Sequence, residues 1–182
     1  MPNFVFIPAL RFVNTQRTAA VSIILQYRKS LNQSPVVPTI DNIKVKTYSG
    51  EHDIQHWLEL RRIAFANENV PAGPWNEADF RREFLAQSWW KPERLWLAES
   101  STDDHSFNVV GTVALAESGS QRRAAIHWLA VHPNWRRQGI ATMLLRQAEL
   151  YCWQHDWRTI HLETHQQWLA ATKFYETMGY VK

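Results

Sequence analysis

Along the main body of the chain, apolar residues recur at the spacing of a strand in some stretches and at the spacing of a helix in others. Positions 43–48 alternate apolar and polar side chains, which predicts a strand with one buried face. Apolar residues at 54–65 recur at helical spacing, and a loop-rich stretch follows at 67–74. Asn76 can then cap a second, short helix, because acidic residues stand in the turn after it. The first third of the main body therefore predicts one strand and two helices.

The second half of the chain predicts four more strands and two further helices. The strands are expected at 95–98, 109–116, 124–131 and 160–163, and the helices at 138–153 and 169–178. Gly179 marks the end of the last helix. This order of elements, with strands and helices interleaved, predicts an α/β domain with a mixed sheet.

Composition and charge narrow the class of protein. Of 182 residues 45% are hydrophobic, enough to bury a core and to exclude a disordered chain. Residues 1–40 hold four of the 20 basic residues and none of the 17 acidic ones, so the main body is almost neutral. A neutral body is a poor match for the phosphate backbone of nucleic acids, and we expect no nucleic-acid partner.

The start of the chain is expected to stand apart from the domain. Its longest uncharged apolar stretch, 18–27, has about half the length that a membrane-spanning helix needs, so no membrane association is expected. We interpret 1–42 as a basic extension with a proline-containing linker and 43–182 as the domain. An acid-free start with Arg leaves an organellar transit peptide open. The single cysteine, Cys152, excludes an intramolecular disulfide and fits a cytoplasmic protein.

The segment 129–142 carries the most chemical information. It reads Leu-Ala-Val-His-Pro-Asn-Trp-Arg-Arg-Gln-Gly-Ile-Ala-Thr, a strand end followed by a turn and a helix start. The first N–H groups of a helix lack partners within it, and the helix dipole is positive there, so an anion is favoured. Gly139 and Ala141 leave room beside the backbone, and Arg136 and Arg137 add positive charge. The pattern indicates a diphosphate-binding turn; the alternative is an ordinary helix start with two solvated arginines.

Two motifs resemble the GCN5-related N-acetyltransferases, the GNAT family. Arg136-x-x-Gly139-x-Ala141 is similar to the signature Arg/Gln-x-x-Gly-x-Gly/Ala of that family. The C-terminal run from Ala171 through Tyr175 to Tyr180 is similar to its Ala-x-x-x-Tyr-x-x-x-Gly-Phe segment. The resemblance covers about 43–182 and implies the acyl-CoA N-acyltransferase fold, a mostly antiparallel mixed sheet flanked by helices.

The resemblance also implies an activity and a set of site residues. It implies transfer of acetyl from acetyl-CoA, the co-substrate, to a primary amine by direct attack in a ternary complex, with no metal. It implies that the backbone of Leu129, Ala130 and Val131 binds the pantetheine arm, the Leu129 amide polarising the thioester carbonyl. It implies that the diphosphate lies beside Arg136 against the amides of Arg137, Gln138, Gly139, Ile140, Ala141 and Thr142. Tyr175 would be the general acid for the leaving thiolate, although a core tyrosine would fit the same pattern.

The general base has several candidates. Strand alternation predicts that His127 shares a face with Leu129 and lies near the thioester, although a structural histidine is an equal alternative. This strand also resembles that of arylalkylamine N-acetyltransferases, but Ala125 replaces the first of their two histidines. Glu163 is the reserve base, and Glu117 is a weaker candidate. His161, Glu163 and His165 have awkward spacing for a metal, so no metal site is expected.

The end of the chain departs from the family pattern. The family usually continues with two more strands beside the fifth, whereas this sequence ends at Lys182, so its C-terminal strands are expected to be short or missing. The chain could be truncated, a partner chain could supply the strand in a homodimer, or the segment 4–13 could fill the position. The alternative function is a degenerate CoA-binding or regulatory module without turnover. The amine acceptor, a small molecule or a peptide, is left open, although Trp75 suggests an aromatic pocket wall.

Overall fold

The computed structural model describes residues 23–66, 73–101, 109–118 and 123–182. Six strands form one sheet in the order β1-β6-β5-β4-β3-β2. Only β5 and β6 run parallel, and the other neighbours are antiparallel. The strands are β1 (Ile24–Ser30), β2 (Ile43–Thr47), β3 (Leu95–Ser100), β4 (Val109–Ser118), β5 (Arg123–Val131) and β6 (Thr159–His165). The predicted mixed, mostly antiparallel sheet is confirmed.

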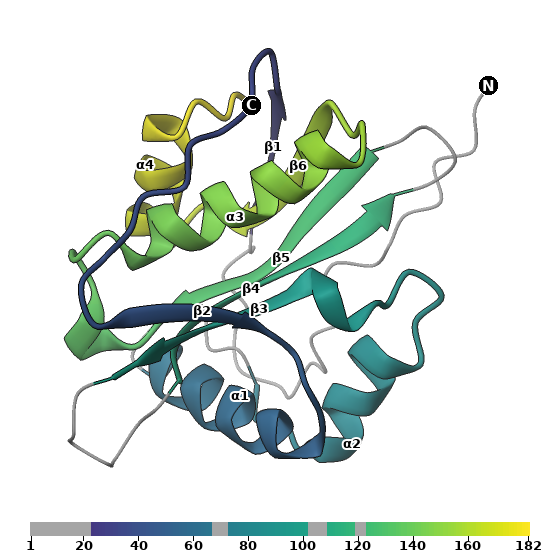
Figure 1. The fold of residues 1–182 in the computed structure, drawn as a ribbon, viewed down its shortest axis with the longest axis vertical. Coiled ribbons are helices and arrows are strands. Elements are labelled where there is room, and N and C mark those ends of the chain that lie inside the picture. Colours follow the sequence, from purple (N-terminus) through teal and green to yellow (C-terminus); the bar gives the residue numbers. More distant parts are fainter. Residues whose placement is uncertain (1–22, 67–72, 102–108, 119–122) are drawn as a thin grey trace.

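Helices cover both faces of the sheet. They are α1 (Glu51–Ala64), α2 (Glu77–Phe80), which continues into a π-helical turn (Arg81–Leu85), α3 (Ile140–Gln154) and α4 (Leu169–Thr177). The first two lie on one face, and α3 and α4 lie on the other (Figure 1). Asn76 caps α2 as predicted, because its side chain accepts from the Asp79 N–H while the Asp79 carboxylate accepts from the Asn76 N–H. In the described ranges, no helix is long and apolar enough to cross a membrane.

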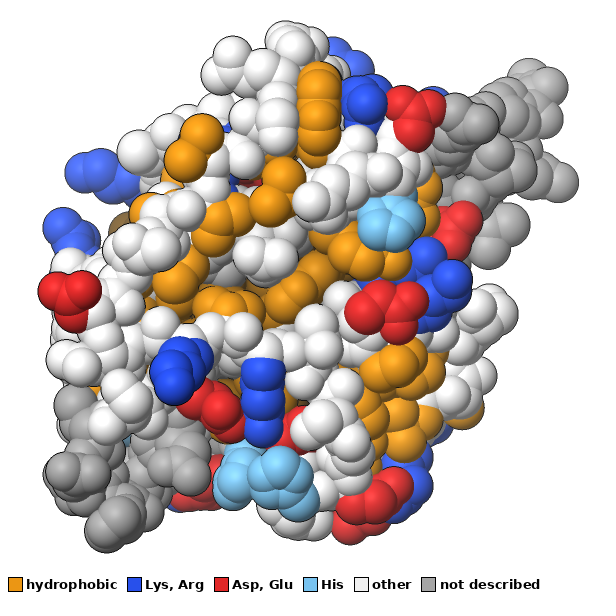
Figure 2. Space-filling model, viewed as in Figure 1, with side chains coloured by type: hydrophobic (Ala, Val, Ile, Leu, Met, Phe, Trp, Pro, Cys, Tyr) orange, Lys and Arg blue, Asp and Glu red, His pale blue; other side chains and the backbone are white. Residues whose placement is uncertain are grey.

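Each face of the sheet buries its own core. Under α3 and α4 the core is mainly aliphatic, whereas under α1 and α2 it is built around Trp57, Phe80 and Phe84, all at most 1% exposed. On the face drawn in Figure 2, basic and acidic side chains are intermixed. The sheet is therefore buried on both sides.

Strand β1 is the main departure from the expected architecture. It pairs antiparallel with β6 along its whole length, from Ile24 opposite His165 to Ser30 opposite Thr159. On its other side, Arg28 exchanges two backbone hydrogen bonds with Val181, the short C-terminal strand element. A strand from the N-terminal side thus covers the edge that missing C-terminal strands would leave open.

The expected division at residue 43 does not hold for residues 24–42. After β1, residues 31–42 cross over α3 to reach β2 at the opposite edge of the sheet (Figure 1). Val37 and Ile40 of this strap pack against the core under α3, so the segment is part of the domain and not a linker. The segment 4–13, one of the three alternatives for filling the edge, lies outside the described residues; the strand in that position is Ile24–Ser30.

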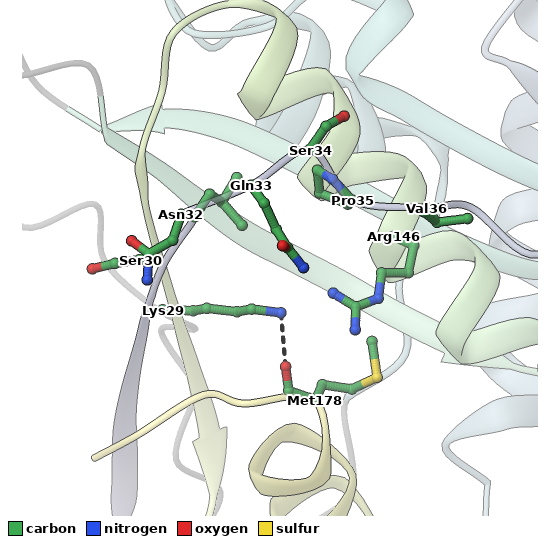
Figure 3. Close-up of a pocket in the computed structure, with 10 residues that line it drawn as sticks. Lys29, Ser30, Asn32, Gln33, Ser34, Pro35, Val36, Arg146 and Met178 are labelled. Atoms are coloured by element: carbon green, nitrogen blue, oxygen red, sulfur yellow. Dashed lines mark hydrogen bonds between the residues drawn. The ribbon is translucent and has the colours of Figure 1, made fainter.

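A buried ion pair fixes β1 to α3. Lys29 Nζ lies 2.7 Å from Glu149 Oε1, donates to the Met178 carbonyl at 2.7 Å, and points with Arg146 into a cavity of about 560 Å³ beneath the strap (Figure 3). Arg146 Nη1 lies 2.6 Å from the second carboxylate oxygen of Glu149. The Glu149 side chain has no exposed surface. This cavity lies at the Thr159 end of β6, where Ser30 is paired, and is separate from the candidate site described below.

Candidate functional site

Strands β5 and β6 separate before they end. Their parallel pairing covers Arg123–Ile126 and Thr159–Leu162 and then stops. Residues 127–131 of β5 continue to pair with β4 on one side, while β6 pairs with β1 through to His165. The two strands diverge, so the β6-facing edge of β5 at 127–131 offers backbone groups that pair with neither strand.

A β-bulge at Trp128 changes which side chains share a face of the sheet. Trp128 has a φ of 51°, and the register with β4 shifts between Thr112 and Ala114. Before the bulge, His127 faces α1 and α2, and Trp128 packs into the same aromatic core. After it, Leu129 and Val131 pack on the α3 side. The expectation that His127 and Leu129 point to the same face is wrong, because the extra residue breaks the alternation.

The turn before α3 presents a row of free backbone donors. Arg137 has a φ of 65° and Gly139 a φ of 86°, left-handed conformations that turn successive N–H groups toward one side. Among the described residues, the N–H groups of 137–142 donate to no protein acceptor, whereas the next one, Met143, donates to the Gly139 carbonyl. Arg136 anchors the turn, its Nη2 donating to the Ala64 carbonyl at 2.7 Å and its Nε to the Val131 carbonyl at 3.2 Å. The turn thus has unpaired backbone donors at 137–142; that they bind an anion stays a prediction.

Tyr175 lies on the α3 side of the sheet, on α4. Its side chain is 7% exposed and packs against the rings of Tyr27 and Tyr180 at centroid distances of 6.2 and 6.0 Å. Burial raises the pKa of the phenol above its ordinary value of 10, so the hydroxyl keeps its proton at neutral pH. Tyr175 therefore shares a face with Leu129 and Val131 and has the protonation state of a proton donor.

His127 lies on the opposite face and stacks on Trp89. The two rings are 5.8 Å apart and nearly parallel, with an interplanar angle of 7°. The buried Nε2 has no hydrogen-bond partner, and burial lowers the pKa of the imidazole from 6.5 to about 4. His127 is therefore neutral at physiological pH.

This depressed pKa makes stability depend on pH. The unfolded chain protonates His127 as the pH falls below about 6.5, whereas the folded chain does so only near pH 4. Proton binding therefore favours the unfolded state between these values, so the free energy of unfolding is highest above pH 6.5 and falls toward pH 4. We expect His127→Gln to remove roughly 2 kcal/mol of the stability difference between pH 7.5 and pH 5, measured by urea unfolding. His52→Gln, at an exposed position, is the control. An unchanged pH dependence in His127→Gln would show that the imidazole titrates normally.

The family can now be assigned. The family model described as the acetyltransferase (GNAT) family matches residues 54–180. The chain belongs to the GNAT family. A mycothiol acetyltransferase of Thermomonospora curvata is 28% identical over 129 residues, which are 70% of this chain and 36% of that protein. This chain spans about a third of the length of such curated relatives.

Solved GNAT structures share the fold. A GCN5-related N-acetyltransferase from Sphaerobacter thermophilus has a TM-score of 0.71 at 23% identity, over 88% of this chain and 48% of that chain. The NatC complex bound to Gag peptide and CoA has a chain with a TM-score of 0.57 at 22% identity, over 75% of this chain and 83% of that chain. The GNAT fold of residues 24–182 therefore includes a strand, β1, from before the region that the family model matches.

The acidic candidates of this GNAT domain have different surroundings. Glu163 is exposed near the end of β6 and accepts a hydrogen bond from Gln26 Nε2 at 3.0 Å. Because Ile126 pairs with Leu162, the next residues, His127 and Glu163, lie on the same face of the sheet. Glu117 instead accepts from Arg94 at 3.3 Å, a structural contact. Glu163 is thus the carboxylate that accompanies His127 on the α1 side.

The same side of the GNAT domain carries an aromatic cluster that the sequence only partly predicts. Trp75 was expected there, and its ring lies 4.8 Å from Trp128 and 5.6 Å from Trp57. Phe65 links Trp128 at 6.1 Å to Trp168 at 5.3 Å, at the start of α4. The missed members come from three separate segments, namely α1 with its C-cap, β5 and the start of α4, and the one signal in the sequence is the high count of ten Trp.

Proposed function

We propose that this chain is an N-acetyltransferase that moves acetyl from acetyl-CoA to a primary amine by direct attack in a ternary complex. The observation that carries the proposal is the row of free N–H groups at 137–142, beside the open edge of β5. A diphosphate and an extended amide-containing arm match these two features in charge and in hydrogen bonding. Membership of the GNAT family supports the same reaction.

The residues of the turn and of β5 fit coenzyme A. The amides of 137–142 would hold the diphosphate, with Arg136 as a neighbouring charge. The edge of β5 at Leu129–Val131 would bind the pantetheine amides as a strand does, and the Leu129 N–H would polarise the thioester carbonyl. Coenzyme A supplies the thioester; the chain supplies the donors that orient it.

In the proposed reaction, the acceptor amine and the proton donor act from opposite faces of the sheet. The acceptor amine would approach from the α1 side, where His127 and Glu163 lie, and attack the thioester carbonyl carbon. As the C–N bond forms and the C–S bond breaks, Tyr175, from the α3 side, would give its proton to the departing thiolate. The Leu129 N–H, next to the bulge at Trp128, would donate to the negative oxygen that develops on the thioester carbonyl.

Proton transfer sets the order of events. An alkylammonium has a pKa near 10, whereas that of His127 is about 4, so direct deprotonation would cost about 8 kcal/mol. The acceptor therefore reacts from its neutral form. His127 or Glu163 then takes the proton only after the nitrogen has become acidic by bonding to the carbonyl carbon.

A CoA-release assay tests the proposal. The full chain with acetyl-CoA and a panel of small amines, amino acids and peptides is expected to release free thiol above the amine-free rate. The alternative, a CoA-binding module without turnover, rested on missing C-terminal strands, and β1 now occupies the position beside β6. Calorimetric binding of acetyl-CoA with no amine-dependent thiol release would favour that module and overturn the proposal.

Gly139→Val tests the diphosphate turn. A β-branched side chain at a φ of 86° costs roughly 1–2 kcal/mol of strain, and its Cβ would lie 3.4 Å from Ile40 Cδ1. We expect acetyl-CoA affinity to fall about tenfold or more in calorimetry. Gly73→Val is the matched control, because a Cβ there meets nothing within 4 Å. Equal affinities for both variants would contradict the assignment of the turn.

A further inference from the structure

One buried charge on the acceptor side is not used by the proposed reaction. Arg61, on α1, is 3% exposed. Its Nη1 donates to the Gly73 carbonyl at 2.8 Å, but its Nε and Nη2 are buried and have no hydrogen-bond partner among the described residues. Buried guanidinium groups are normally paired, so these two donors are an exception that needs a ligand.

Two tryptophan rings enclose this guanidinium. Arg61 Cζ lies 4.5 Å from the centroid of Trp75 and 4.8 Å from that of Trp128. Among the described residues no carboxylate bonds to it: the nearby Asp79 instead accepts from the Asn76 N–H and lies 2.8 Å from Arg82 Nη2. Burial lowers the pKa of Arg61 to about 10, yet the group remains a cation at neutral pH. The site is thus a desolvated positive charge between aromatic walls.

The free donors have the geometry of a carboxylate site. Nε and Nη2 lie on one edge of the planar guanidinium, the edge that forms two parallel hydrogen bonds with a carboxylate. The Trp128 ring, whose centroid lies 4.8 Å from Arg61 Cζ, belongs to the residue before Leu129, and the Leu129 N–H is the group proposed to polarise the thioester carbonyl. A carboxylate bound there would lie on the α1 side of the sheet, the side from which the acceptor approaches.

We infer that Arg61 binds a carboxylate of the acceptor, and that the acceptor is an amine of the amino-acid type with an apolar or aromatic side chain. The inference rests on the proposed acetyl transfer and adds the class of acceptor. Trp57, Trp75 and Trp128 supply the apolar walls. Both free nitrogens are covered in this structure, so a carboxylate would reach them only after a covering side chain has moved.

Matched acceptors test this inference. Phenylalanine and 2-phenylethylamine differ only by the carboxylate, as do tryptophan and tryptamine. In the CoA-release assay, we expect the wild type to prefer the amino acid of each pair in kcat/KM. Arg61→Gln is expected to lower kcat/KM for the amino acids about tenfold to a hundredfold, with the loss in KM, and to leave the amines within about threefold. Arg61→Lys keeps the positive charge but lacks the two parallel donors of the guanidinium. Its kcat/KM for the amino acids should therefore lie between the values of the wild type and of Arg61→Gln.

Controls separate binding from folding and from the reaction itself. Arg62→Gln alters an exposed neighbour on the same helix that bonds to Glu59, and should keep the wild-type preference. Calorimetry with CoA and N-acetylphenylalanine is expected to show binding that Arg61→Gln loses. Equal turnover of both members of each pair by the wild type, an equal fall for both in Arg61→Gln, or no N-acetylphenylalanine binding would overturn the inference. Absence of thiol release with every amine would instead overturn the proposed function.

Discussion

Tyr175→Phe is expected to lower kcat for CoA release at least about a hundredfold while the KM for acetyl-CoA changes little. The variant keeps the ring, which is 7% exposed and packs against Tyr27 and Tyr180, and removes only the proton donor. Without that proton the thiolate must leave as an anion, so the loss falls on the chemical step. Steady-state kinetics with saturating amine measure both constants.

Tyr180→Phe is the matched control for this variant. Tyr180 is 1% exposed on the neighbouring turn, and burial raises its pKa as well, but its ring lies 6.0 Å beyond Tyr175 in the core. We expect its kcat to stay near the wild-type value. Because burial keeps the Tyr175 phenol protonated past pH 10, no fall in rate below pH 10 should come from this residue. Equal kcat values in the two variants would make Tyr175 a core residue only.

Local sequence signals predicted most of the elements that build the site. The capping box of α2 and the small residue at the start of α3 depend on neighbours within four positions, and the structure has both. The turn at 136–142 could likewise be predicted, because its candidate ligand-binding groups are backbone N–H groups that the local conformation exposes. Features set by short-range geometry can be predicted from one sequence.

Features set by long-range pairing were not predictable. Burial alternates along β1, but Ile24 stands at an exposed position and Lys29 at an inward one, so the residue types do not alternate and the strand resembles an extension. Its place in the sheet depends on β6, more than 120 residues later in the chain. The bulge at Trp128 was not predictable either. A φ of 51° at a tryptophan is set by the pairing of the strands and not by the backbone conformation that tryptophan prefers. Arg61 looked like any charged helix residue, since its burial depends on Trp75 and Trp128.

Tyr27→Ala is expected to destabilise the domain by about 3–5 kcal/mol, the usual cost of truncating a large buried aromatic side chain. Tyr27 is 2% exposed, packs 6.2 Å from the Tyr175 ring, and donates from its hydroxyl to Glu176 Oε1 at 3.0 Å. For a domain of this size the loss corresponds to a fall in Tm of roughly 6–20 °C, measurable by calorimetry or circular dichroism. The strand before the strap would then be a structural part of the catalytic domain.

The adjacent residue gives the control that makes this test decisive. Gln26 is exposed on the same strand, and among the described residues its side chain bonds to Glu163 alone, so Gln26→Ala should change stability by less than about 1 kcal/mol. Because Tyr27 also packs on Tyr175, its loss should lower kcat in the folded fraction as well. Matching melting temperatures for the two variants would mean that β1 is not held against β6 in solution. The edge of β6 would then need another strand to cover it, and a second copy of the chain would be the first to look for.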